Sequence, residues 1–145
     1  TFHRLVGLSD RYVFGQAGNP FDEPFEDNVL THDPVRYRRH REQIAMCPEL
    51  ALGPPTWGWL DAALRATVLV SDPYRLRRVA VPVILCAAGD DRRVHVEALR
   101  QAAANLPDGR LVEIPGAYHE ILMETDQLRR PFWQAFDQLL SRCIR

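Results

Sequence analysis

The stretch VAVPVILCAAGDDRRVHVEALRQAAANLPDGRLVEIPGAYHE, residues 79–120, decides the fold of this chain. It opens with a continuous apolar run rich in β-branched residues, which is typical of a strand buried on both faces in a parallel sheet. HVEALRQAAANL follows as an amphipathic helix that ends at Pro107 and Gly109, and RLVEIPG is a second strand stopped by Pro115. The order strand, helix, strand indicates two parallel strands that lie side by side.

The residues after this stretch complete an α/β unit. QLRRPFWQAFDQLLSRCI, residues 127–144, predicts a final helix with Pro131 in its first turn, where a missing N–H costs little. Residues 79–145 therefore form a predicted βαβα unit. A strand as apolar as residues 79–88 should have a neighbour on each side, and this chain supplies only one of them. We expect the other strands of the sheet to come from elsewhere.

The residues before the unit, 1–78, are expected to be mostly helical. GQAGNPFDEP, residues 15–24, is rich in turn formers, and Asp33-Pro34 is a turn or helix-start signal. Residues 35–70 then predict two helices separated by prolines. The second, WGWLDAALRATVLV, has apolar residues at helical spacing.

Composition narrows the class of protein. A length of 145 residues fits one domain, and 46% hydrophobic with 26% charged residues fits a globular chain rather than a disordered one. The net charge of −1 argues against a nucleic-acid or anionic-membrane partner.

The chain has an odd number of cysteines without metal-site spacing: Cys47, Cys86 and Cys143. This pattern favours a reducing, cytoplasmic location without disulfides or zinc. No apolar run approaches the length of a transmembrane segment.

Polar side chains of a catalytic type follow both predicted strands. Asp90 and Asp91 come directly after the first strand, and His119 lies a few residues beyond the second. In an open α/β sheet, functional groups collect beyond the carboxyl ends of the strands, so neighbouring parallel strands should bring these groups together. A carboxylate beside a histidine can fix its tautomer and leave the other ring nitrogen to serve a nucleophile. Singly, each residue is more often structural; the pair, in this order and at matching strand ends, favours catalysis.

Two segments resemble one family. VPVILCAAGDDRRVHVEAL (81–99) and LVEIPGAYHEILME (111–124) are similar to the C-terminal part of the α/β-hydrolase family that contains monoacylglycerol lipases and L2-type lysophospholipases, the serine aminopeptidase S33 or hydrolase 4 family. NVLTHDPVRYRRHREQIAMCPELALGPPTWGWL (28–60) resembles the lid region of its lysophospholipase-type members. The resemblance thus extends from residue 28 to residue 124, over most of the chain.

The resemblance implies a fold and a site. The fold would be the C-terminal part of an α/β-hydrolase, with parallel strands and flanking helices in residues 79–145 preceded by a helical lid region in residues 1–78. Asp91 matches the acid of the catalytic triad, with Asp90 as the fallback, and His119 matches the histidine. This chemistry requires no metal and no organic cofactor.

The nucleophile of the family has no counterpart in these residues. The chain contains three serines, none with glycine two residues to either side: Ser9, Ser71 and Ser141. The G-x-S-x-G elbow and the oxyanion hole are therefore missing. Because the opening TFHRLVGL also lacks methionine, we expect a serine upstream of Thr1 in a longer protein and an inert isolated chain. No cysteine sits in the electropositive, accessible setting that an activated thiol needs.

Two tryptophans are candidate substrate-binding residues. Trp57 and Trp59, with Pro54 and Pro55, could line a pocket for an acyl chain, since ligand sites are mostly apolar and aromatic. An equally good interpretation is that they anchor the lid to the core. The arginines of Arg38–Arg41 are interpreted as a solvated helix face.

The leading hypothesis is part of a serine hydrolase that cleaves carboxylic esters of lipids, of the lysophospholipase or monoacylglycerol lipase type. Its partners would be a small-molecule lipid ester and the N-terminal half of the same protein. The alternative is a non-catalytic interaction module that retains a hydrolase half-fold and uses its open sheet edge for docking. The same fold also hosts peptidases, dehalogenases and epoxide hydrolases, among which fold alone does not choose.

Overall fold

The computed structural model of this chain describes residues 7–13 and 24–144. Most of the turn-rich stretch before the first helix lies outside these residues. Its helices and strands, in chain order, are η1 (Phe25–Asp27), α2 (Pro34–Met46), η2 (Pro48–Leu50), α3 (Trp57–Ser71), α4 (Pro73–Leu76), β1 (Val83–Ala88), α5 (Val96–Asn105), β2 (Gly109–Ile114), η3 (Ile121–Met123) and α6 (Asp126–Cys143).

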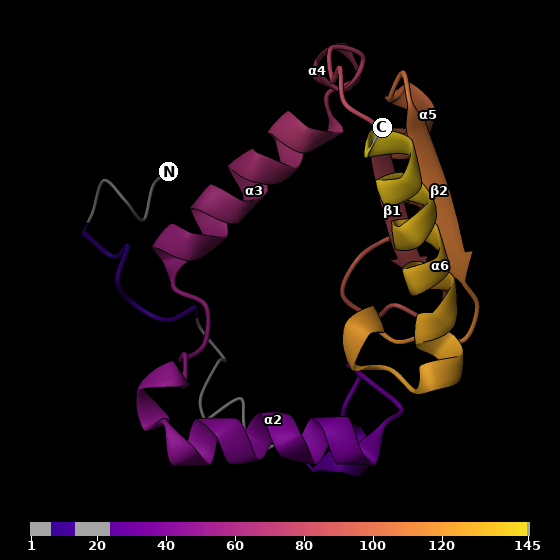
Figure 1. Cartoon of the computed structure of the whole chain (residues 1–145). Coiled ribbons are helices and arrows are strands. Elements are labelled where there is room, and N and C mark those ends of the chain that lie inside the picture. Colours follow the sequence, from indigo (N-terminus) through magenta and orange to yellow (C-terminus); the bar gives the residue numbers. More distant parts are fainter. Residues whose placement is uncertain (1–6, 14–23, 145) are drawn as a thin grey trace.

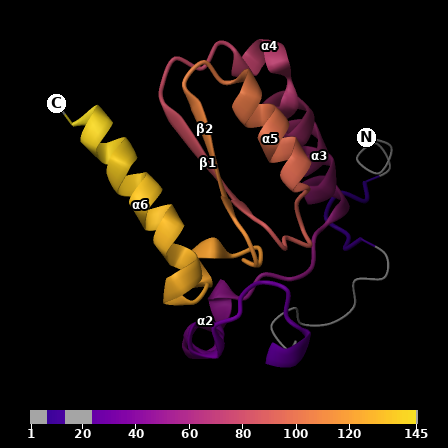
Figure 2. The same cartoon turned by 90° about the vertical axis from the view of Figure 1, so that its right-hand side faces the viewer.

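The two strands pair in parallel, as the sequence predicts. Their register runs from Val83 opposite Gly109 to Ala88 opposite Ile114. Helix α5 covers one face of the strand pair with α3 beside it, and α6 covers the other face (Figure 2). Figure 1 shows α2 apart from these layers, near the start of α6. None of the described helices is both long and apolar enough to cross a membrane.

The buried core lies at the carboxyl ends of the strands. Ala88, Ile114 and Ala117 form its centre, each no more than 3% exposed. Partly buried apolar side chains pack around them: Val112, Ile121, Leu128 and Phe132. The best-packed part of the molecule is thus directly beneath the loops that follow β1 and β2.

The first strand is shorter and less buried than predicted. It begins at Val83 rather than at residue 79, because Pro82 has no N–H to donate to a strand ladder. Only Ala87 and Ala88 are buried along it. The apolar run is therefore not buried over its whole length among the described residues, where β1 has only one of the two neighbouring strands that we expect.

The last helix also differs in one detail from the helix that the sequence predicts. The sequence places Pro131 in its first turn, but α6 begins at Asp126, so Pro131 lies one turn further in. Thr125 stands at the N-cap position without a side-chain cap hydrogen bond, and the carboxylate of Asp126 lies beside the free N–H groups of the first turn, which favours the earlier start. Pro131 then removes one internal helix hydrogen bond.

The starts of the two lid-region helices are set by side-chain caps. Asp33 accepts hydrogen bonds from the backbone N–H groups of Val35 and Arg36. Thr56 caps α3 by accepting from the N–H of Trp59. These caps confirm the predicted helix start at Asp33-Pro34, because each satisfies N–H groups that a helix leaves free.

The pairing of β1 with β2 continues into their loops. The N–H of Gly89 donates to the Ile114 carbonyl at 2.9 Å, and that of Asp90 donates to the Ala117 carbonyl at 3.0 Å. The loops run so close together that a Cβ on Gly89 would lie 2.9 Å from the Cα of Pro115. Gly116, at φ 77°, then turns the chain in a conformation that favours glycine.

We expect Gly89→Ala to lower the free energy of unfolding by about 1–3 kcal/mol, because the added methyl must displace backbone atoms. Urea denaturation followed by tryptophan fluorescence measures this. Asp90→Ala is the control: Asp90 contributes only its backbone here, so its substitution should change stability by less than about 0.5 kcal/mol. Equal losses in the two variants would contradict the steric argument.

Candidate active site

Asp91 and His119 meet at the carboxyl ends of the two parallel strands. The Nδ1 atom of His119 lies 2.9 Å from Oδ2 of Asp91, within hydrogen-bonding distance. The Asp91 side chain is 7% exposed and that of His119 is 32% exposed, so the carboxylate is covered while the ring reaches solvent. The predicted meeting of an acid and a histidine is confirmed; their catalytic role stays a prediction.

The loop after β1 holds the Asp91 carboxylate in a fixed orientation. Its Oδ1 atom accepts hydrogen bonds from the N–H groups of Arg93 at 2.7 Å and Val94 at 3.0 Å. The other carboxylate oxygen of Asp91, Oδ2, is the one that contacts the imidazole of His119. Burial would raise the pKa of Asp91, but hydrogen bonds from His119 and from these two N–H groups outweigh burial and hold the pKa below its ordinary value.

This arrangement can support general acid–base catalysis. An ionised Asp91 accepts the hydrogen on Nδ1 of His119, which leaves Nε2 unprotonated in the neutral ring. Within the described residues, Nε2 has no hydrogen-bond partner. A hydroxyl group brought to Nε2 could therefore transfer its proton to the ring, and Asp91 would stabilise the resulting imidazolium.

The other candidates of the sequence lie elsewhere. Asp90 is exposed and directs no side-chain hydrogen bond to the described residues, so Asp91 and not the fallback Asp90 contacts His119. Cys86 lies within β1, and burial raises the pKa of its thiol, which disfavours a nucleophilic thiolate. Ser141 donates to a carbonyl in its own helix. Among the described residues, no cluster of three or more His, Cys, Asp or Glu side chains could hold a metal ion.

The two tryptophans lie at the start of α3. Trp57 is half-buried, and its backbone N–H donates to the Arg11 carbonyl at 3.0 Å. Trp59 is 62% exposed. Figure 1 shows the start of α3 apart from the carboxyl ends of the strands. The structure thus does not bring these rings together with Asp91 and His119, and their role in substrate binding stays a prediction.

Sequence reasoning missed a buried acid next to the site. Glu124 has no exposed surface, and its carboxylate accepts hydrogen bonds from the N–H of Tyr118 and from the ring and N–H of His32. Glu124 ends the segment HEILME, residues 119–124, directly after three apolar residues and five residues after His119. This position of an acid was the sequence signal that could have revealed it. An acid in such a setting is expected to be hydrogen-bonded.

Parallel strands between helices, with an acid and a histidine at the strand ends, define an α/β-hydrolase. The fold resembles that of a soluble variant of monoglyceride lipase from Saccharomyces cerevisiae, with a TM-score of 0.60 and 20% identity over 79% of this chain and 40% of that one. The family described as serine aminopeptidase, S33 (Hydrolase_4) matches residues 8–126. The chain belongs to this family.

Two curated relatives cover nearly the whole chain. It is 37% identical to lysophospholipase L2 of Escherichia coli strain K12 in an alignment of 142 positions that covers 92% of this chain and 40% of that protein. It is 28% identical to a probable lysophospholipase L2 of Haemophilus influenzae over 141 residues, 97% of this chain and 44% of that protein. The chain therefore spans less than half the length of these relatives.

The lowered pKa of Asp91 gives a pH-dependent contribution to stability. The unfolded chain binds the proton at the ordinary value of 3.8, whereas the folded chain binds it only at lower pH. The contribution is thus complete above 3.8 and is lost as the pH falls through the folded value. We expect Asp91→Asn to weaken the acid dependence of the urea midpoint. In the control Asp90→Asn the urea midpoint should fall with acid as it does in the wild type. If the midpoint of this control became independent of pH, the assignment of the effect to Asp91 would be contradicted.

Proposed function

We propose that this chain is the C-terminal part of a serine hydrolase that cleaves carboxylic esters of lipids, with Asp91 and His119 as the acid and the histidine of its triad. The observation that carries the proposal is the hydrogen bond between these two side chains at the ends of adjacent parallel strands. The nucleophilic serine would come from outside these 145 residues.

The proposed reaction uses His119 twice. Nε2 takes the proton of the serine hydroxyl as its oxygen attacks the ester carbonyl, and then gives that proton to the departing alcohol. In the second half, Nε2 takes a proton from the water that attacks the acyl-serine and returns it to the serine as the acid leaves. Asp91 keeps Nδ1 protonated and stabilises the charged ring in both halves.

The choice of a lipid ester rests on the relatives. Both curated relatives are named lysophospholipase L2, and the similar solved structure is a monoglyceride lipase. The family description names an aminopeptidase, and the same triad chemistry opens esters and amides. We favour the ester because the matches to the named lysophospholipases extend over more than nine-tenths of this chain.

Packing supports the proposal that the chain works with further strands and helices. Strand β1 has a single strand partner among the described residues, which leaves its other edge unpaired there. Large apolar side chains are exposed along α3, including Leu64 at 60% and Val68 at 72%. Extended apolar surfaces of this kind are usually covered in a complete protein.

We further propose that residues 1–78 act as the lid and residues 79–145 as the C-terminal unit of the core. The described part of the lid region joins the core where α3 and α4 pack beside α5 and where residues 30–36 bond to residues 120–126. We base the proposal of a reducing compartment such as the cytoplasm on the odd number and the spacing of the three cysteines.

In the enzyme that includes the upstream serine, we expect His119→Ala to lower kcat for short-chain p-nitrophenyl esters by at least about a thousandfold, because the general base is removed. His95→Ala is the matched control, since His95 is exposed and makes no cap hydrogen bond at the start of α5. Wild-type turnover by His119→Ala would remove this histidine from the mechanism.

If Trp59 lines the acyl-chain site, Trp59→Ala should raise KM for long-chain esters and leave short-chain esters unaffected, because only a long chain would reach it. Each buried CH2 group contributes about 0.8 kcal/mol, so loss of contact with two such groups corresponds to roughly a tenfold change. Steady-state kinetics over a series of chain lengths measures this. A change that is the same at every chain length would favour the anchoring role.

A further inference from the structure

Glu124 is a buried acid that the proposed reaction does not use. Its side chain is fully buried, and burying a carboxylate is costly unless hydrogen bonds replace its hydration. Oε1 accepts from the N–H of Tyr118 at 2.7 Å and from Nδ1 of His32 at 2.8 Å. Oε2 accepts from the N–H of His32 at 3.0 Å and from the N–H of Thr125 at 3.2 Å. The carboxylate thereby joins two segments that are distant in the sequence.

Hydrogen bonds hold the backbone on both sides of the candidate catalytic histidine, His119. Tyr118, the residue before His119, donates its N–H to Glu124, and Glu120, the residue after it, donates its N–H to the Leu30 carbonyl at 2.9 Å. The backbone after His119 is thus bonded directly to Leu30, whereas the backbone before it is bonded to Glu124, which in turn accepts hydrogen bonds from His32. Asp91 holds the ring itself, so three separate contacts determine where the imidazole lies.

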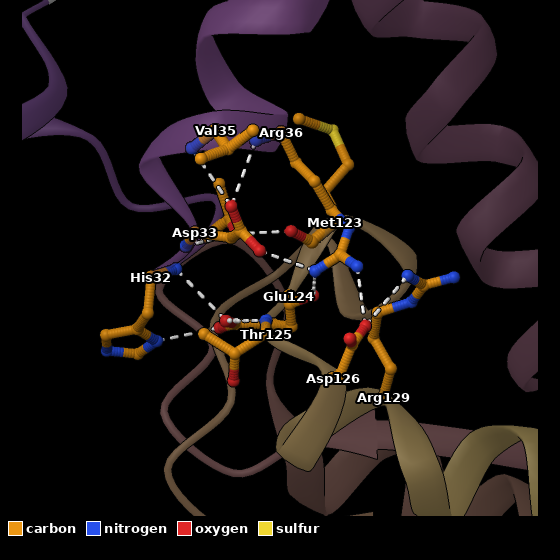
Figure 3. Close-up of polar contacts among 10 residues, drawn as sticks. His32, Asp33, Val35, Arg36, Met123, Glu124, Thr125, Asp126 and Arg129 are labelled. Carbon is orange, nitrogen blue, oxygen red and sulfur yellow. Dashed lines mark hydrogen bonds and ion pairs between the residues drawn. The ribbon is translucent and has the colours of Figure 1, made fainter.

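The segment that meets Glu124 is itself firmly held. The Thr31 hydroxyl donates to the Met123 carbonyl at 2.6 Å, and Arg36 donates to the Glu124 carbonyl at 2.6 Å and to the Asp126 side chain (Figure 3). The His32 ring also stacks on the Tyr118 ring, with their centroids 3.8 Å apart. Arg92, the residue after Asp91, lies over the same tyrosine ring at 5.8 Å.

From this geometry we propose that Glu124 is a positioning residue for His119. It fixes the backbone of the histidine loop against residues 30–36, so the start of α2 supports the catalytic histidine in addition to belonging to the lid. The proposal rests on the proposed hydrolase function. A displacement of a catalytic group by about 1 Å can cost up to about a hundredfold in rate, so loosening this loop should be visible in kcat.

The test compares two isosteric substitutions in the enzyme that includes the upstream serine. Glu124→Gln replaces one acceptor oxygen by an NH2 group and so breaks part of the network without changing its volume. Glu113→Gln is the matched control, because it breaks an ion pair with Arg100 on the exposed side of β2. We expect Glu124→Gln to lower kcat for a short ester about 10- to 100-fold with KM within about threefold, and the control to keep the wild-type kcat.

A second variant covers the case in which Glu124→Gln does not fold. His32→Phe keeps a ring against Tyr118 but removes the Nδ1 donor, and the His32 side chain is already 40% exposed. Loss of one hydrogen bond to the carboxylate should lower kcat about two- to tenfold. Wild-type kcat in His32→Phe, or in a folded Glu124→Gln, would overturn the positioning role while leaving the hydrolase function intact.

The position of the ring can also be measured without activity. The Nδ1 proton of His119, hydrogen-bonded to Asp91, should give a downfield NMR signal that broadens in Glu124→Gln and persists in Glu113→Gln. An unchanged signal in Glu124→Gln would overturn the proposal. If the signal broadens while His119→Ala retains full ester turnover, the positioning role stands and the proposed hydrolase function fails.

Discussion

The candidate site depends on the parallel pairing of β1 and β2, because this pairing brings the loops after the two strands to one place. The pairing continues past the strand ends through the N–H groups of Gly89 and Asp90, which bond to the backbone beyond β2. Those bonds set the separation of the loops before any side chain is considered. Asp91 and His119 can then meet at 2.9 Å with ordinary hydrogen-bond geometry.

The pairing brings the acid and the histidine together but does not by itself hold the longer histidine loop. His119 lies five residues beyond Ile114, whereas Asp91 lies three residues beyond Ala88 and is fixed by N–H groups of its own turn. The longer loop needs support from outside the strand pair, and Glu124 with residues 30–36 supplies it. The fold thus positions the acid locally and the histidine through a contact between distant segments.

This difference explains what the sequence could predict. Strand order, the parallel sheet, the helix start at Asp33 and the meeting of Asp91 with His119 follow from local patterns: apolar runs, capping residues and polar groups at strand ends. The full burial of residues 79–88 did not follow, because burial depends on neighbouring strands that the run itself does not specify. The position of Pro131 within its helix depends on where that helix begins, and α6 begins at Asp126, one residue before the predicted start.

The contacts of Glu124 could not be predicted for a different reason. Its main partner, His32, is 92 residues away, and no periodic pattern connects the two positions. A buried carboxylate is worth its desolvation cost only when several donors converge on it, and here they come from three residues, His32, Tyr118 and Thr125. Such convergence specifies one arrangement of the loops more strictly than apolar packing would, because an apolar contact tolerates small shifts that a hydrogen bond does not. In this chain the network of Glu124 reaches the residue directly before His119, and the proposed positioning role rests on that contact.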